Sequence, residues 1–316
     1  MNRARKRDYI GRFAPSPTGP LHAGSVVAAL ASWLDARAHA GRWLLRIEDI
    51  DPPREVAGAG ELIIATLERL GLRTDAPPLW QSTRQPAHLL AIDSLRAQGM
   101  VYDCSCSRRE IREHLAATGR LDDPGIGDAG PPYPGICRGG PMRRRDHYTQ
   151  RYRVDDRIIH WADRPAGHAQ GRLQSEHLAE TSGDFPLRRA DGLISYQLAV
   201  VVDDGAAGVT DVVRGADLVS STARQHDLAD ALGLPRPRTL HIPVLTDRDG
   251  VKLSKQTGAP AVTAEGDMRS RMAELDRALE HLGLAPVRAD SIQEWQCQAI
   301  ARWRESRWFV TDDPGA

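Results

Sequence analysis

Lysine is almost missing from this chain of 316 residues. Lys6, Lys252 and Lys255 are its only lysines, so 39 of its 42 basic residues are arginines. An excess of charge of one sign is missing too, because 42 acidic residues balance the basic ones. A surface that binds nucleic acid through overall charge is therefore excluded, and any contact with RNA needs a local basic patch.

Long apolar runs and a disulfide framework are also missing. No stretch approaches the ~18 consecutive apolar residues that a membrane-spanning helix needs, and the arginine-rich N-terminus has no apolar signal core. Four cysteines in a chain of this length do not form the framework of a disulfide-rich secreted protein. We therefore expect a soluble, cytoplasmic, monomeric protein with no membrane partner and with length for roughly two domains.

The common motifs of nucleotide and hydrolase chemistry are missing as well. The sequence has no Walker A loop, no zinc-protease helix motif and no serine elbow. A formal dinucleotide fingerprint occurs at 125–130, but it follows no expected strand and runs into Pro131 and Pro132. No helix can begin there to receive a pyrophosphate, so any nucleotide must bind at a different kind of loop.

The sequence does contain the alternation of strands and helices that is typical of an open α/β sheet. The first expected elements are strands at 9–13 and 43–47 and helices at 25–40 and 61–72. Asp51 before Pro52 predicts a helix start with the aspartate as its cap. We therefore expect a doubly wound Rossmann domain, in which ligands bind beyond the carboxyl ends of the strands.

The same pattern resumes in the second half of the chain. An almost continuous apolar run at 193–202 ends in Asp203 and Asp204, which is typical of a buried parallel strand. The two aspartates are expected to cap this strand and orient its neighbours. A further strand is expected at 240–245, and apolar residues recur at helical spacing from Met268 onward.

Composition changes between these two halves. Residues 103–187 hold three of the four cysteines and the basic run Arg143 to Arg145, which either contacts RNA phosphates or is a solvated run of charge. We expect the chain to be organised as a Rossmann catalytic domain in two halves, an inserted zinc-bearing subdomain, and a lysine loop followed by a short helical part. In residue numbers these are 8–102 and 188–245, 103–187, and 246–316.

Two short segments suggest a nucleotide site. Residues 22–25 (HAGS) lie where a loop enters a helix, so backbone N–H groups and the helix dipole favour an anion there. Gly24 would let a ring or a phosphate approach the backbone, although a plain helix-capping turn explains the same residues. Residues 252–256 (KLSKQ) bring two lysines into one loop, where an ammonium can follow a moving phosphate. Two solvated loop lysines are the alternative.

Together these segments resemble the HIGH and KMSKS signatures of the class I aminoacyl-tRNA synthetases. Residues 13–19 (FAPSPTG), 46–49 (RIED) and 212–217 (VVRGAD) are similar to the glutamyl branch of that class. Three features favour a truncated group of paralogues within this branch. About 60 residues follow the lysine loop, too few for a helical anticodon-binding region; Gln256 replaces the usual serine or arginine; and the cysteine spacing matches that group's zinc site. The resemblance covers about residues 8–260.

The resemblance implies a pocket for L-glutamate, and charge matching suggests its residues. Arg12 and Arg214, both expected at strand ends, can each bind a carboxylate through two nitrogens. Glu48 can hold the ammonium group and Tyr196 can shape the wall, while the family adds Ser16 nearby. Without the family, Arg214 would be a surface arginine and Glu48 a charge at a helix start.

A metal site is expected in the inserted part. Three cysteines lie close together in the sequence: Cys104, Cys106 and Cys137. In a reducing compartment such a group favours zinc over a disulfide, and zinc needs a fourth ligand, for which His114 and His147 are the first chemical candidates. The resemblance implies Tyr133 instead. Three unligated thiols are the alternative, and Cys297 is assigned to packing.

The resemblance implies a ligase that activates L-glutamate with ATP and Mg²⁺, without tRNA, and transfers the glutamyl group to queuosine at the wobble position of tRNA(Asp). The ATP-binding residues would be His22, Gly24, Ser25, Lys252 and Lys255. His22 and Lys255 would also act in catalysis, and one zinc ion would be bound per chain. Two alternatives stay open: a short glutamyl-tRNA synthetase that charges the 3′ end of tRNA, and a non-catalytic paralogue that binds glutamate or RNA.

Overall fold

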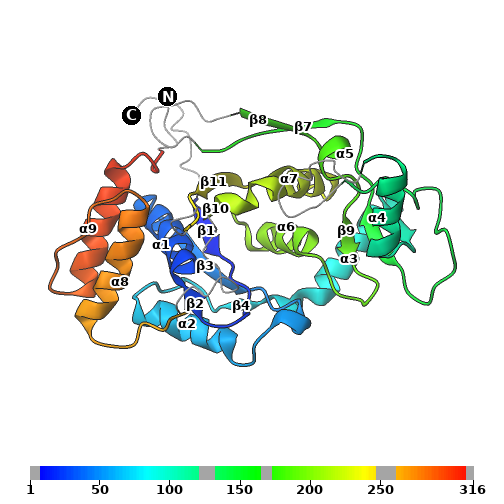
Figure 1. Cartoon of the computed structure of the whole chain (residues 1–316). Coiled ribbons are helices and arrows are strands. Elements are labelled where there is room, and N and C mark those ends of the chain that lie inside the picture. The colour runs from blue at the N-terminus through cyan, green and yellow to red at the C-terminus, as the bar shows by residue number, and fades with distance from the viewer. Residues whose placement is uncertain (1–7, 121–131, 165–172, 247–260, 311–316) are drawn as a thin grey trace.

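A parallel sheet with helices on both faces forms the centre of the molecule (Figure 1). The computed structural model describes residues 8–120, 132–164, 173–246 and 261–310. The parallel strands are β1 (Ile10–Phe13), β3 (Arg42–Ile47), β4 (Leu79–Trp80), β10 (Asp211–Gly215) and β11 (Arg238–Ile242). β3 pairs with both β1 and β4, and β10 pairs with β11, in each case in parallel. The N–H of Thr210 donates to the carbonyl of Ile10 over 2.9 Å, which places the start of β10 beside β1. This arrangement confirms the expected Rossmann fold.

The helices follow the expected alternation with two exceptions. They are α1 (Ala23–Ala38), α2 (Ala59–Arg69), α3 (Gln85–Ala97), α4 (Arg108–Ala117), α5 (Leu178–Thr181), α6 (Tyr196–Ala207), α7 (Thr222–Ala231), α8 (Met268–His281) and α9 (Ile292–Glu305), with 3₁₀ turns η1 (Pro52–Arg54), η2 (Gln81–Arg84) and η4 (Ala216–Ser221). The prediction that a helix starts at Asp51 is wrong. Only the three-residue turn η1 forms there, and the Asp51 carboxylate pairs with Arg54 instead of capping it.

The second exception is the segment 193–204, for which a strand was expected. This prediction is wrong, because the segment forms α6. The helix is buried on most of its surface, so its apolar residues show no helical stripe and resemble a buried strand. It ends at Gly208, whose φ of 66° is the left-handed conformation that glycine adopts without strain. The next expected strand is correct in position, but β11 ends at Ile242 because Pro243 has no N–H to donate.

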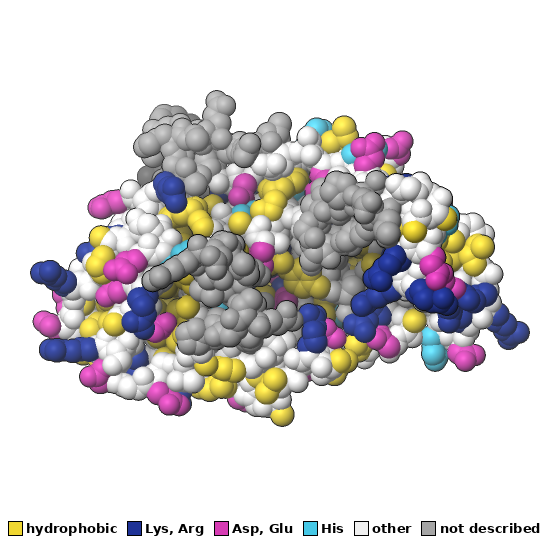
Figure 2. Space-filling view, in the orientation of Figure 1, with side chains coloured by type: hydrophobic (Ala, Val, Ile, Leu, Met, Phe, Trp, Pro, Cys, Tyr) yellow, Lys and Arg dark blue, Asp and Glu magenta, His cyan; other side chains and the backbone are white. Residues whose placement is uncertain are grey.

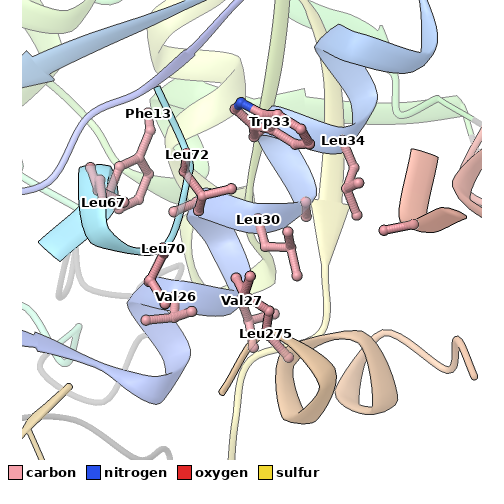
Figure 3. Close-up of a cluster of buried hydrophobic side chains, with 14 of the residues drawn as sticks. Phe13, Val26, Val27, Leu30, Trp33, Leu34, Leu67, Leu70, Leu72 and Leu275 are labelled. Carbon is pink, nitrogen blue, oxygen red and sulfur yellow. The ribbon is translucent and has the colours of Figure 1, made fainter. Parts of the chain in front are cut away.

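One apolar core joins the sheet to helices from both ends of the chain. Figure 3 shows Phe13 from β1, Leu30 and Trp33 from α1, Leu67 from α2 and Leu275 from α8 packed together. All five are less than 8% exposed. The C-terminal helices are therefore part of the core around the parallel sheet.

The middle of the chain forms two small antiparallel sheets. They consist of β5 (Val101–Cys104), β6 (Thr149–Tyr152) and β9 (Pro186–Arg188), and of β7 (Ile158–Ala162) and β8 (Leu173–His177). Tyr152 and Leu187 are buried in one cluster with Leu198 of α6 and Leu228 of α7. The first sheet thus shares its core with helices of the Rossmann part.

The C-terminal helices confirm the helical spacing seen in the sequence, with two corrections. Leu275 and Leu279 are buried, but Met268, at the start of α8, is 43% exposed. Cys297 lies on the exposed face of α9, so its assignment to packing is wrong. Within the described residues, no helix has both the length and the apolar character needed to cross a membrane.

Candidate active site

A cleft of about 640 Å³ opens at the carboxyl ends of β1 and β10, where ligands bind in open α/β sheets. Most of the residues expected to bind substrate line it: Arg12, Ser16, His22, Gly24, Ser25, Tyr196 and Arg214. Glu48 does not line the cleft and lies 7% exposed behind it. Lys252 and Lys255 lie outside the described residues. The structure therefore brings together groups that are up to about 200 positions apart in the sequence.

One wall of the cleft is the N-terminus of α1. His22 is the N-cap, and its Nδ1 accepts a hydrogen bond from the N–H of Ser25 over 3.3 Å. Because Nδ1 is the acceptor, a neutral ring carries its proton on Nε2. A Cβ added at Gly24 would lie 3.1 Å from Cε1 of His22, so the space beside this glycine is taken by the histidine ring.

The structure describes the residues on both sides of the lysine segment. The strand β2 (Leu21–His22) pairs antiparallel with β12 (Ala261–Val262), and Ala261 lies opposite His22. On the other flank, Pro243 to Leu245 line the cleft. On one side these flanking residues line the cleft, and on the other β12 pairs with β2, whose His22 lines it.

Arg214, at the end of β10, is buried at the cleft with neutral partners. Its Nη1 donates to Oε1 of Gln225 over 2.7 Å, its Nη2 to Oγ1 of Thr222 over 2.8 Å, and its Nε to Nε2 of His241 over 3.1 Å. Three of its five N–H groups are used in this way, and the Tyr196 phenol at the cleft is a further hydrogen-bond partner.

The charge on Arg214 is not neutralised by direct contact with a carboxylate among the described residues. Burial lowers the pKa of its guanidinium, while the Tyr196 phenol and the charge of Asp204 raise it in part. Tyr196 is the first residue of α6 and lines the cleft. A buried cation beside an open cleft, with no carboxylate in contact among the described residues, can bind an anion, above all a carboxylate.

Behind Arg214 lies a buried ionic network that sequence reasoning missed in part. Asp204 accepts from Nε of Arg12 over 3.3 Å and from Nη1 of Arg46 over 2.6 Å, and Arg46 also donates to Glu48 over 3.2 Å. Burial would raise the pKa of Asp204, but Arg12 and Arg46 more than offset this and lower it. For Glu48, burial outweighs Arg46 and Arg12 and raises the pKa.

The second aspartate of α6 fixes the helix from the other side. Asp203 accepts from Gln81, Arg84 and His88 over 2.9, 3.1 and 3.0 Å. Burial would raise the pKa of Asp203, but His88 and Gln81 more than offset this and lower it. Both aspartates orient their neighbours as expected, but from a helix and not from the end of a strand.

Some of these contacts could have been predicted from the sequence, and others could not. Arg46 lies on β3 and Glu48 directly follows this strand, two positions further on, so their side chains share one face, and this spacing could have linked them. Asp204 could be placed only once its segment was recognised as a helix. Gln225 and His241 reach Arg214 from different elements, and no local pattern marks them.

Three cysteines and a tyrosine meet in the antiparallel part. The sulfurs of Cys104, Cys106 and Cys137 lie within 4.8 Å of one another. The Tyr133 Oη lies 3.2 Å from Sγ of Cys104 and 3.6 Å from Sγ of Cys106. Within the described ranges, the group contains no histidine, so neither His114 nor His147 joins it.

The chemistry of this group suits a metal. Burial raises the pKa of the Cys137 thiol, but the N–H groups of Met142 and Ser105 more than offset this and lower it to about 6. Burial raises the pKa of Cys106 to about 12. Three thiol sulfurs and one phenol oxygen converging on one point fit the four-coordinate geometry of zinc.

The basic run that follows the cysteines is partly neutralised. Arg143 and Arg145 both pair with Glu110 of α4, and Arg145 also donates to the carbonyl of Ser105 over 2.7 Å. Figure 2 shows basic side chains gathered over the part of the molecule where α4 lies in Figure 1, with acidic side chains among them. Because of these contacts, less positive charge is available to bind RNA phosphates than the sequence suggests.

Comparisons with known proteins agree with this geometry. The family model described as tRNA synthetases class I (E and Q), catalytic domain, matches residues 10–128 and 142–294. The glutamyl-Q tRNA(Asp) synthetase of Bordetella bronchiseptica is 50% identical over 300 residues, which cover 94% of this chain and 89% of that protein. That of Aromatoleum aromaticum is 47% identical over 310 residues, covering 97% of this chain and 90% of that protein.

Among solved structures, the glutamate-tRNA synthetase from Elizabethkingia anophelis superposes with a TM-score of 0.63 at 28% identity. The match covers 80% of this chain and 53% of that one, so this chain spans about half of the length of that synthetase. A glutamate tRNA ligase from Elizabethkingia meningosepticum, solved with its amino acid, matches equally well. The chain belongs to the catalytic-domain family of the class I tRNA synthetases for glutamate and glutamine.

Proposed function

We propose that this protein activates L-glutamate with ATP and transfers the glutamyl group to queuosine at the wobble position of tRNA(Asp). The observation that carries the amino-acid part is Arg214, a buried cation at the cleft whose hydrogen-bond partners among the described residues are all neutral. The tRNA part is supported by the names of relatives that are about half identical to this chain. Glutamate would place one carboxylate on Arg214 and the other near Arg12.

In the first step an oxygen of the glutamate α-carboxylate attacks the α-phosphorus of ATP, and pyrophosphate leaves. No protein nucleophile is needed, because positioning and charge stabilisation accelerate this reaction. His22, Gly24 and Ser25 at the N-terminus of α1 would hold the nucleotide, and Lys252 and Lys255 would follow the phosphates. Mg²⁺, when bound with ATP, would neutralise phosphate charge.

In the second step a hydroxyl of the queuosine ring attacks the activated carbonyl carbon of glutamate, and AMP leaves. The glutamate and adenylate groups would occupy a single cleft built from the described Rossmann residues. Glu48 lies behind Arg12, and its negative charge would attract the ammonium group of glutamate. Burial raises the pKa of the Glu48 carboxyl. Because most of the described residues proposed to bind glutamate and ATP line one cleft, we propose that the first step does not require tRNA.

The cysteine group would hold one zinc ion through Cys104, Cys106, Tyr133 and Cys137. The ion would bind the end of β5 to the segment around Cys137, and its role would be structural, since the cleft is lined by other residues. Elemental analysis of the purified protein tests this independently of activity.

The activity is tested in two assays. Glutamate-dependent exchange of pyrophosphate into ATP should occur without tRNA, and no other amino acid should replace glutamate. Labelled glutamate should then enter tRNA(Asp) that contains queuosine, but not the same tRNA made without it. After nuclease digestion the label should lie in the anticodon fragment. Label at the 3′-terminal ribose, or exchange that begins only when tRNA is added, would contradict the proposal.

A further inference from the structure

We propose that Asp163 and His241 are positioning residues that hold the Arg214 guanidinium in the orientation that binds the glutamate carboxylate. This inference rests on the proposed function, because it assumes that Arg214 binds glutamate. Neither residue lines the cleft, and neither is marked by a motif in the sequence.

The first contact is between neighbouring strands. His241 lies on β11 directly opposite Arg214 on β10 (Figure 1). Nε2 of His241 accepts the Nε–H of Arg214 over 3.1 Å and lies 3.4 Å from the hydroxyl of Thr222. Since Nε2 must present a lone pair to the guanidinium, the neutral ring carries its proton on Nδ1.

Asp163 lies beside Nδ1, close enough for a charge interaction although the two side-chain atoms are not aligned for a hydrogen bond. Its Oδ1 lies 3.1 Å from Nδ1 of His241, and its Oδ2 accepts the backbone N–H of the same histidine over 3.0 Å. The aspartate follows β7, and the next residue, Arg164, donates its N–H to the carbonyl of Thr239 on β11 over 2.7 Å. The backbone of the β7 end is thus fixed against β11, with the carboxylate held beside one histidine.

The surroundings keep the ring neutral. The groups that face His241 are Asp163, Arg214 and Asp217, while the ring of Trp161 lies 5.9 Å from the imidazole. Burial, followed by the positive charge of Arg214, lowers the pKa of His241 in spite of the two carboxylates. A protonated ring would carry a proton on Nε2 as well as on Nδ1, and the Nε2–H would then oppose the Nε–H of Arg214.

Three acceptors therefore fix the plane of the guanidinium. Gln225 and Thr222 bind its two terminal nitrogens, and His241 binds the third. Without the His241 contact the guanidinium can rotate, and its N–H groups on the side of the cleft no longer point in a fixed direction. Losses of supporting contacts of this kind typically weaken a site by ~10–100-fold.

The decisive variant is Asp163→Asn, which keeps the size of the side chain. The backbone N–H of His241 requires the amide oxygen, so the NH₂ group faces Nδ1. Nδ1 must then accept, the ring proton moves to Nε2, and Nε2–H opposes the Nε–H of Arg214. We expect the KM for glutamate in pyrophosphate exchange to rise ~10–100-fold, with kcat and the KM for ATP little changed.

A matched control is available in the same part of the chain. Asp156 contacts Nε2 of His177 over 2.6 Å, and its side chain is 91% exposed. Asp156→Asn changes an aspartate–histidine pair in the same way but away from the cleft. It should leave the KM for glutamate unchanged.

A second measurement does not depend on the folding of a variant. Nitrogen-15 NMR of the histidine rings, with His241 assigned by its loss in His241→Gln, reports which nitrogen carries the proton. The unaltered protein should show the proton of His241 on Nδ1, and Asp163→Asn should show it on Nε2. A proton on Nε2 in the unaltered protein would overturn the inference.

The inference and the proposed function fail in different ways. If Arg214→Gln keeps the normal KM for glutamate, Arg214 does not bind glutamate and the proposed assignment is wrong. If Arg214→Gln loses glutamate but Asp163→Asn keeps the normal KM, Arg214 is confirmed and the positioning role of Asp163 and His241 is rejected.

Discussion

Five charged side chains are buried together at the cleft and directly behind it: Arg12, Arg46, Glu48, Asp204 and Arg214. Three guanidinium groups face two carboxylates, so the group carries one net positive charge when all are ionised. A buried charge without a counter-charge is unfavourable in free energy. A carboxylate bound at the cleft would supply the counter-charge. The charge balance alone therefore favours an anionic substrate, before any relative is considered.

Arg214→Lys tests whether the guanidinium shape matters beyond its charge. A lysine has three donors at one point and cannot serve Gln225, Thr222, His241 and a carboxylate together. We expect glutamate binding to weaken by about 2–5 kcal/mol, because a buried carboxylate loses its matched partner. The measurement is the KM for glutamate beside the KM for ATP. Equal weakening of both would indicate misfolding and contradict the assignment.

Lys255 is tested by the same exchange assay, although it lies outside the described residues. If its ammonium is used mainly as the α-phosphorus becomes five-coordinate, Lys255→Ala should lower kcat by ~10²–10³ with little change in KM. Lys255→Arg should also be impaired, because a planar group cannot occupy the same point. Lys252→Arg should be milder and serves as the control. Normal turnover in Lys255→Arg would show that only the charge matters.

At this scale the sequence predicts part of the site. Arg12 and Arg214 could be found because carboxyl ends of parallel strands meet at one edge, which is a rule of the fold. His241 and Gln225 could not, because their roles depend on which side chains face one another across strands and helices. Such contacts follow from packing, and no spacing in the chain encodes them.

Among the elements, α6 shows where sequence reasoning fails and why. Its run of Leu198 to Val202 is buried on nearly all sides, so the helix lacks the polar stripe that distinguishes a surface helix from a strand. The aspartates that follow were expected on a strand end, but the helix directs Asp204 to Arg12 and Arg46. Because the segment was predicted to be a strand, the ionic network could not be predicted from the sequence.

Asp204→Asn tests how much this helix depends on its buried charge. Removing one partner of a buried ionic group should cost about 3–5 kcal/mol of unfolding free energy. Arg12 and Arg46 lower the pKa of Asp204 in the folded state, so the folded state resists protonation. Its contribution to stability is therefore complete above about pH 4 and is lost as the pH falls toward the lower folded pKa.

The measurement is the free energy of unfolding by denaturant between pH 2 and 6 for both proteins. The variant should lose less stability on acidification than the unaltered protein, because it lacks this carboxylate. Identical pH dependence in the two proteins would contradict the role assigned to Asp204.

The segment from β5 to Cys137 gives a prediction about metal. The purified protein should contain about one zinc per chain, and Cys137→Ser should lose it, because tetrahedral zinc needs all four ligands. Tyr133→Phe removes only the oxygen that lies 3.2 Å from Sγ of Cys104, so it tests the fourth ligand separately. Cys297→Ser, on the exposed face of α9, is the control. Full zinc content in Cys137→Ser would reject the site.

Across the whole molecule, Asp35 on α1 joins parts of the chain that are far apart in sequence. Its buried carboxylate accepts hydrogen bonds from Tyr9 and Arg164, and from Nε1 of Trp303 on α9 over 3.0 Å. The motifs that carry the resemblance to synthetases end near residue 260, although the family model matches as far as residue 294, so the motifs alone did not place α9 in the catalytic core. Its burial against α1 shows that the C-terminal helices stabilise the Rossmann part.

Trp303→Phe tests this connection, with Trp308→Phe as its matched control. Both tryptophans are buried near the C-terminus, but Trp303 donates to the Asp35 carboxylate, whereas Trp308 donates to the carbonyl of Leu282 over 2.8 Å. Loss of a hydrogen bond to a charged group should cost about 1.5–3 kcal/mol, and loss of the neutral one about 0.5–1.5 kcal/mol. We expect a single denaturant transition in each protein, in which circular dichroism and glutamate-dependent exchange are lost together. If Trp303→Phe were no more destabilising than Trp308→Phe, or if exchange survived an earlier transition of the C-terminal helices, Asp35 would not join α9 to the catalytic core in the way its contacts indicate.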